Sequence, residues 1–145
     1  MKLLAIDPAY AKPYGFSFWV DGRLVEKGLF GSMDIASDLV SGADFVVIED
    51  QYNRFNYKVS KGLSLAAGKI LGLCEYFNVD YQIINIAKWQ NYFNLYKSIQ
   101  GMKGQKRKIA KVDLTIEKAR QYDEDINDVD IASAVLIGAY TVDTL

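Results

Sequence analysis

Short apolar runs and longer segments of helical periodicity alternate along the chain. The apolar runs predict five strands, at residues 3–7, 14–20, 24–30, 45–48 and 81–86, with a hairpin turn at Asp21-Gly22. Helical patterns lie at residues 33–40, 61–77, 87–96, 106–121 and 128–142. This order predicts one α/β domain over residues 1–145, with a mixed five-stranded sheet flanked by helices and its first three strands antiparallel.

The apolar surface of the helix expected at residues 61–77 is wider than one stripe. One stripe consists of Leu63, Ala67, Ile70, Leu71 and Cys74, and further apolar residues lie beside it at Leu65, Leu73 and Tyr76. A helix of this kind is buried on two sides. Gly68 and Gly72 leave room for a close neighbour. We therefore expect one side to cover the sheet and the face of residues 63–74 to form a homodimer contact.

The composition excludes several classes of chemistry. The chain has no histidine, so histidine-based triads and histidine-ligated zinc are excluded. Its single cysteine, Cys74, cannot form an internal disulfide, which fits a reducing compartment. No run approaches the ~20 apolar residues that cross a bilayer, and Asp7 interrupts the apolar N-terminus too early for a signal peptide. We expect a cytoplasmic protein without a membrane partner.

Acidic residues occur at three places where a site can form. Asp7 and Glu49 end the first and fourth predicted strands, and five acids lie within residues 123–130. The alternative is structural: the first two acids face water and the rest cap a helix N-terminus. However, Asp130 falls in the first turn of an apolar helix, where a carboxylate must be paired or coordinated. Converging carboxylates without histidine indicate Mg²⁺, and two such ions can clamp a phosphoryl displacement.

Cations gather in two other segments. Residues 101–111 contain no acid and five cationic residues, namely Lys103, Lys106, Arg107, Lys108 and Lys111. The loop after Glu49 interleaves aromatic and basic residues, among them Tyr52, Arg54 and Lys58. A run of charge is usually a solvated helix face, and loop aromatics often pack locally. Together with an acidic site, the two segments favour phosphate and base contacts despite a net charge of −1.

Four segments resemble the RuvC-type Holliday-junction resolvases, which have the ribonuclease H-like fold. The matching segments are Ile6-Asp7-Pro8 with Tyr14-Gly15-Phe16, residues 46–52 (as phage-encoded members carry them), residues 60–72 of the dimer helix, and residues 127–132. The resemblance implies a homodimeric endonuclease that uses Mg²⁺ or Mn²⁺, two per site, to nick four-way and other branched DNA. For a phage-encoded protein, the location would be the cytoplasm of a bacterial host.

The resemblance also implies roles for individual residues. Asp7, Glu49 and Asp130 match three of the family's four metal-binding acids, and Asn127 or Asp128 is the fourth. Tyr52 matches an aromatic that enters the junction centre, and Lys106 or Lys108 a basic residue near the cleaved phosphate. Two alternatives remain: a ribonuclease H-like or YqgF-like enzyme acting on RNA, and a non-catalytic module that binds branched DNA.

Overall fold

The computed structural model describes residues 1–50 and 57–145, with side chains from Lys61 onward in the second stretch. Its strands are β1 (Lys2–Asp7), β2 (Tyr14–Val20), β3 (Arg23–Phe30), β4 (Phe45–Asp50) and β5 (Asp80–Asn85). They form one five-stranded sheet in the order β3-β2-β1-β4-β5. β1, β2 and β3 are antiparallel, whereas β4 runs parallel to β1 and β5 parallel to β4. The predicted mixed sheet with three antiparallel strands is confirmed.

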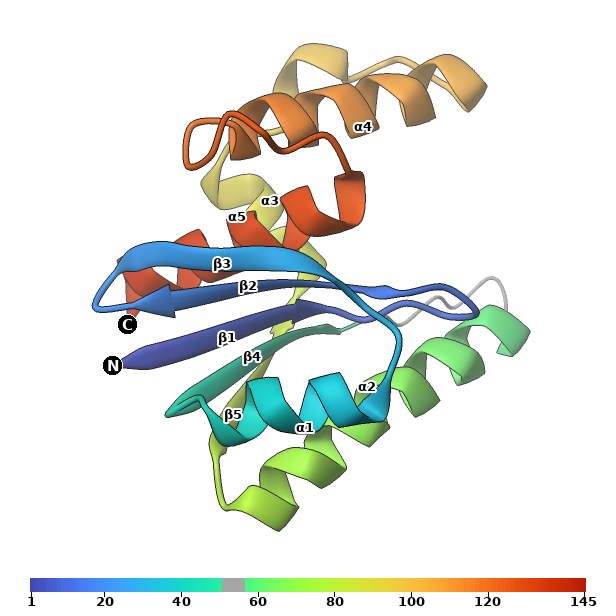
Figure 1. Ribbon diagram of the computed structural model, residues 1–145. Helices are drawn as coiled ribbons and strands as arrows, with labels where there is room; N and C mark the ends of the chain where they lie inside the picture. Colours follow the sequence, from blue (N-terminus) through green and yellow to red (C-terminus); the bar gives the residue numbers. More distant parts are fainter. Residues whose placement is uncertain (51–56) are drawn as a thin grey trace.

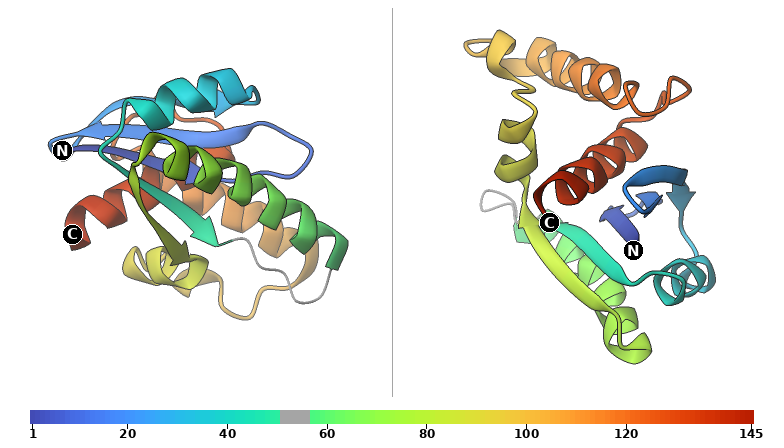
Figure 2. Two further views of the ribbon diagram at one scale, coloured as in Figure 1. Left: turned by 90° about the horizontal axis from the view of Figure 1, so that it is seen from below. Right: turned by 90° about the vertical axis from the view of Figure 1, so that its left-hand side faces the viewer.

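Helices cover both faces of the sheet. They are α1 (Met33–Ser41), α2 (Tyr57–Phe77), α3 (Ile86–Tyr92), the short 3₁₀ helix η1 (Lys97–Ile99), α4 (Gly104–Ala119) and α5 (Val129–Thr144). α1 and α2 lie on one face and α5 on the other, with α4 stacked outside α5 (Figures 1 and 2). The core accordingly has two parts, one between the sheet and α5 and one between the sheet and the α1–α2 layer.

Two predicted helix limits are wrong. The helix expected at residues 87–96 ends at Tyr92, after which Asn94 adopts a left-handed backbone with φ of 51°. The chain turns there because Leu95 and Ile99 are buried, at 6% and 8% exposure, in positions that a straight helix would not give them. The helix expected from residue 61 begins at Tyr57, inside the segment predicted as a loop.

Helix α5 lies unusually close to β2. Gly15 on β2 and Gly138 on α5 each occupy a place where a Cβ would overlap atoms of the other element. Between them the buried Ser17 hydroxyl donates to the Ala134 carbonyl at 2.6 Å, and the Trp19 indole donates to Ser17 Oγ at 2.9 Å. Because residue 15 has no side chain, the first turn of α5 can lie close to the sheet. This turn carries Asp130.

The long helix α2 has one side inside the subunit and one side in solvent. Ile70 and Cys74 are fully buried against the sheet, at 0% exposure. On the opposite side Leu65 is 61% exposed and Tyr76 81%, and the intervening glycines are exposed. The face that the sequence assigns to a dimer is thus partly used within the subunit, and the free apolar stripe is the one through Leu65 and Tyr76. No helix in the described part of the chain is both long and apolar enough for a membrane span.

Candidate active site

Asp7 and Glu49 are brought together by strand pairing. β1 and β4 are parallel neighbours with Ile6 opposite Ile48, so the carboxyl ends of both strands lie at the same edge of the sheet. Alternate side chains of a strand share a face. Asp7 therefore points to the same side as Ala5, and Glu49 to the same side as Val47, which is the side covered by α5. Both acids are buried, with 8% and 3% exposure.

Asp130 reaches the same place from the first turn of α5. Together with Asp7 and Glu49 it lines a cavity of about 390 Å³ at the end of the sheet. The structure thus brings three of the predicted metal-binding acids to one cavity. Further residues that line it come from the β1–β2 loop, α3, α4 and α5, among them Lys12, Trp89, Lys111, Thr115 and Ser133.

The cavity concentrates negative charge where little water reaches it. Burial raises the pKa of the Asp7 carboxyl well above its ordinary value, and the carboxylates of Glu49 and Asp130 raise it further. The Lys12 ammonium opposes this shift, and the charge of Asp128 adds to it. A site of this kind favours a bound cation, because a cation offsets the mutual repulsion of the acids.

Two protein groups hold the other acids. The Lys12 ammonium lies 2.9 Å from Oδ2 of Asp130, and this hydrogen bond raises the pKa of Lys12. The buried Trp89 indole donates to Oε2 of Glu49 at 2.6 Å. Neither contact was predicted, because sequence spacing gives no sign that residues 12 and 89 meet these acids. Ser133 was also missed, although its position three residues after Asp130 places it on the same helix face.

The donor set suits a hard divalent cation. Asp7, Glu49 and Asp130 offer carboxylate oxygens, which are the ligands that Mg²⁺ and Mn²⁺ prefer. Within the described residues, no three acidic or cysteine side chains are arranged as a finished metal-binding group. A lysine ammonium and an indole N–H contact oxygens of two of the acids. The Lys12 side chain is 56% exposed, so it can move from Asp130 into solvent.

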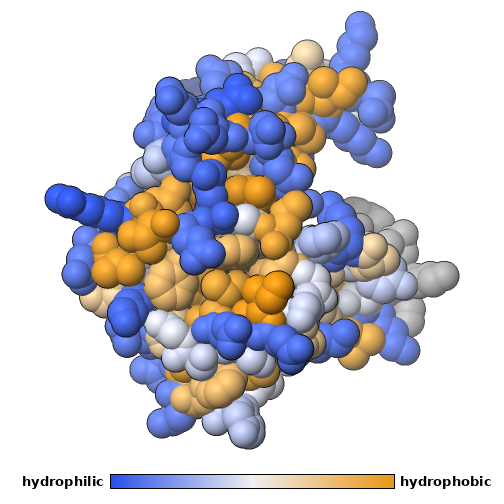
Figure 3. Space-filling view, in the orientation of Figure 1, coloured by the Kyte–Doolittle hydropathy of each residue, from blue (hydrophilic) through white to orange (hydrophobic). Residues whose placement is uncertain are grey.

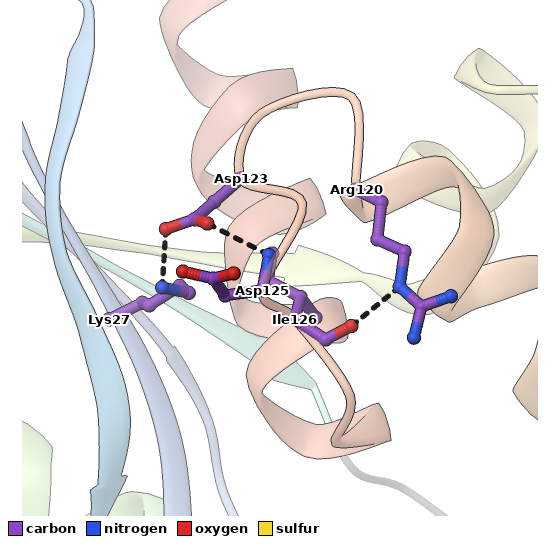
Figure 4. Close-up of polar contacts among 5 residues, drawn as sticks. All are labelled: Lys27, Arg120, Asp123, Asp125 and Ile126. Atoms are coloured by element: carbon purple, nitrogen blue, oxygen red, sulfur yellow. Dashed lines mark hydrogen bonds and ion pairs between the residues drawn. The ribbon is translucent and has the colours of Figure 1, made fainter.

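Asp123, another acid of residues 123–130, has a structural role. Asp123 pairs with Lys27 of β3, which lowers the pKa of Asp123, and it accepts a hydrogen bond from the Asp125 N–H at 3.0 Å (Figure 4). Arg120 fixes the same loop by donating to the Ile126 carbonyl at 2.8 Å. These contacts hold the loop between α4 and α5 against the sheet. The capping alternative from the sequence holds for Asp128, the N-cap of α5, whereas Asp123 forms an ion pair instead.

The two candidates for a fourth metal ligand lie off the cavity wall. Asp128 is the N-cap of α5, and its Oδ1 accepts from the N–H groups of Asp130 and Ile131 at 2.9 and 3.0 Å. Asn127 is exposed. Neither residue lines the cavity, so a role for either as a ligand stays a prediction.

The predicted cations are divided between the cavity and the surface. Lys111 lines the carboxylate cavity and Arg107 is half-buried, whereas the three others on or beside α4, Lys103, Lys106 and Lys108, are exposed. Hydrophilic side chains gather over α4 at the top of the space-filling view (Figure 3). Tyr52 and Arg54 lie outside the described residues, and Lys58 is described by its backbone alone.

Comparison with solved structures identifies the fold of this chain. No protein-family model and no curated protein matches the chain. Among solved structures, RuvC of T. thermophilus in complex with a Holliday junction substrate superposes with a TM-score of 0.66 at 15% identity, covering 97% of this chain and 91% of that one. The chain has the RuvC fold. A second Thermus thermophilus RuvC structure gives a TM-score of 0.65 at 14% identity, covering 97% and 92%.

A eukaryotic protein has the same fold. The yeast mitochondrial Holliday junction resolvase Ydc2 superposes with a TM-score of 0.53 at 11% identity, covering 97% of this chain and 77% of that one. The sheet order and the flanking helices are those of the RNase H-like fold of RuvC. The fold class expected from the sequence is confirmed.

Proposed function

We propose that this chain is a metal-dependent endonuclease that hydrolyses phosphodiester bonds in four-way and other branched DNA. The observation that carries the proposal is the cavity lined by Asp7, Glu49 and Asp130 at the carboxyl ends of β1 and β4 in a RuvC fold. Solved structures with this fold include a RuvC bound to a Holliday junction substrate and a mitochondrial junction resolvase. Both the substrate and the reaction are inferred from that likeness and from the chemistry of the cavity.

Six side chains of the cavity have a part in the proposed reaction. Asp7, Glu49 and Asp130 would hold Mg²⁺ or Mn²⁺. Bound there, such an ion would supply Lewis-acid chemistry at the phosphate and a lower pKa for a water molecule. Trp89 fixes the Glu49 carboxylate through its 2.6 Å hydrogen bond. Lys111, which also lines the cavity, and Lys12, once it leaves Asp130, neutralise the phosphate of the bound strand.

The direct test compares three end-labelled substrates: an immobile four-way junction, a linear duplex of the same arms and an RNA–DNA hybrid. With Mg²⁺ we expect nicks in the junction alone, and none in the presence of a chelator. Faster cleavage of the hybrid would replace the proposal with an RNA-directed nuclease. Tight junction binding without cleavage at any Mg²⁺ or Mn²⁺ concentration would leave a non-catalytic DNA-binding protein.

We further propose that the active form is a homodimer that joins through the exposed side of α2. The apolar residues left in solvent there are Leu65 and Tyr76, and Ile83 on the neighbouring edge strand β5 is 49% exposed. Exposed Gly68 and Gly72 lie between them with no atom nearby, so a second helix can approach closely. A two-fold axis at this face would present two cavities to two strands of one junction.

Substitution of Leu65 with glutamate is expected to produce monomers. A two-fold contact buries the new carboxylate twice, and an uncompensated buried charge costs about 3–5 kcal/mol, so we expect at least about a hundredfold weaker association. Sedimentation velocity at micromolar concentration measures this. Ile35→Glu on α1, where the isoleucine is 48% exposed, is the matched control and should remain dimeric. A wild-type protein that sediments as a monomer would contradict the dimer.

A further inference from the structure

A second cavity, of about 450 Å³, adjoins the carboxylate cavity between α3, η1 and α4. Its described lining includes three cations and four side-chain amides but no acid. The residues that matter most here are Asn94, Lys97, Gln100, Arg107 and Lys111. A cavity of this size falls within the range of about 300–1,000 Å³ typical of small-ligand sites. Its chemistry is opposite to that of the carboxylate cavity.

The two cavities share part of their walls. Gln90, Tyr96 and Lys111 line both of them. A DNA strand with one phosphate at the carboxylates therefore has its next nucleotide within reach of the second cavity. This step rests on the proposed function, because it takes the cleaved phosphate to lie beside Asp7, Glu49 and Asp130.

Two of the three cations of the second cavity are held in place before any ligand binds. Arg107 and Lys111 lie one turn apart on α4, and both are half-buried. Arg107 donates from Nη1 to the Ile99 carbonyl at 2.8 Å, which leaves its other N–H groups for an anion. The Lys111 ammonium lies 4.9 Å from the centre of the Tyr96 ring. Because these side chains are already ordered, binding a phosphate costs them little conformational entropy.

The amides indicate a ligand that is more than a phosphate. A phosphate oxygen only accepts hydrogen bonds, whereas Asn94 and Gln100 each present a donor and an acceptor. The combination of a hydrogen-bond donor and an acceptor is complementary to the edge of a nucleobase, which carries donors and acceptors as well. The left-handed backbone of Asn94, with φ of 51°, ends α3 through a 3.0 Å hydrogen bond to the Asn91 carbonyl and so places the amide at the cavity.

We propose that this cavity is a subsite for one nucleotide next to the cleaved phosphate, with its base out of the stack. Arg107 and Lys111 bind its phosphate, and the amides of Asn94 and Gln100 hydrogen-bond the edge of its base. Leaving the stack costs least where pairing is already interrupted, as at a branch point. The subsite makes cleavage depend on the base at that position as well as on the branched shape.

The test measures binding rather than cleavage. Single-stranded pentadeoxynucleotides that differ in their central base are titrated, by fluorescence anisotropy without metal, against the full chain. We expect affinities to differ by about five- to a hundredfold between central bases. Asn94→Ala with Gln100→Ala should bring the four probes within about twofold of one another, because the base contacts are lost while the phosphate contacts stay. Arg107→Gln should weaken all four by about tenfold or more.

Two controls separate a built subsite from diffuse attraction. Lys88→Gln removes an exposed cation from α3, and Gln105→Ala an exposed amide from α4; both should bind like the wild type. Equal losses in Arg107→Gln and Lys88→Gln, or an unchanged base preference in the double variant, would overturn the subsite. If junctions are cut and the probes show no base preference, the subsite alone fails. Base preference without any junction cleavage removes the proposed function and leaves a base-selective nucleotide site that is not part of a nuclease.

Discussion

Replacing Asp7 with asparagine is expected to abolish junction cleavage and leave junction binding intact. Asparagine keeps the shape of the side chain but removes the charge from the centre of the cavity. A bound metal contributes several kcal/mol to such a reaction, so cleavage should fall by at least about a thousandfold at about 1.4 kcal/mol per factor of ten. Binding should be equal or slightly tighter, because one negative charge near the phosphate is gone. Single-turnover cleavage and gel-shift titration on the same junction measure the two effects.

The same substitution is expected to stabilise the metal-free protein. The pKa of Asp7 is raised in the folded state by burial and by its acidic neighbours. The folded chain therefore binds this proton more readily than the unfolded chain, and its stability falls as the pH rises from the ordinary value of 3.8 through the folded pKa. Asparagine does not titrate. The variant should melt above the wild type at neutral pH in a chelator, and the difference should vanish near pH 3.8.

An exposed acid provides the control for both effects. Asp38 lies on α1, on the far side of the sheet from the cavity, and its side chain is exposed. Asp38→Asn should cut junctions and melt like the wild type. If Asp7→Asn cleaves at the wild-type rate with Mg²⁺, Asp7 is not part of the active site. If the melting temperature of Asp7→Asn at neutral pH is below that of the wild type, the Asp7 carboxylate makes contacts that stabilise the fold by more than its burial costs.

Much of this site follows from strand periodicity. An acid directly after an apolar run predicts a carboxylate at a strand end, and the parallel pairing of β1 with β4 makes two such ends meet. Period-two alternation then puts Asp7 and Glu49 on the same face, as Ala5 and Val47 indicate. These are local rules, which is why the sheet, Asp7 and Glu49 could be predicted from the strand pattern.

The remaining features depend on contacts between distant segments. The sequence singles out Asp130 by its place in the first turn of an apolar helix, but only the packing of α5 on β2 brings it to the cavity, and nothing in the sequence shows that Asp123 pairs with Lys27. Lys12 and Trp89 meet their acids across 118 and 40 positions. The end of α3 at Tyr92 likewise follows from burial of Leu95 and not from local propensity.

Gly15→Ala is expected to damage both the fold and the site. A Cβ at position 15 would lie 2.5 Å from the carbonyl carbon of Asp130, overlap its carbonyl oxygen and lie 3.1 Å from the Ile131 nitrogen. These are backbone atoms of a helix, so no side chain can rotate away. Overpacking costs about 1–3 kcal/mol, and this case belongs at the upper end, which corresponds to a fall in melting temperature on the order of 10 °C.

The loss should extend to function, because α5 can accept the methyl group only by moving Asp130 away from Asp7 and Glu49. We expect Gly15→Ala to cleave junctions at least about tenfold more slowly at a temperature where it is still folded, since a displacement of about 1 Å can cost a hundredfold. Gly31→Ala is the matched control: a Cβ there meets nothing within 4 Å, so stability and cleavage should be unchanged. A Gly15→Ala protein with the melting temperature of the wild type would mean that α5 lies farther from β2 than described. Asp130 would then also lie farther from Asp7 and Glu49.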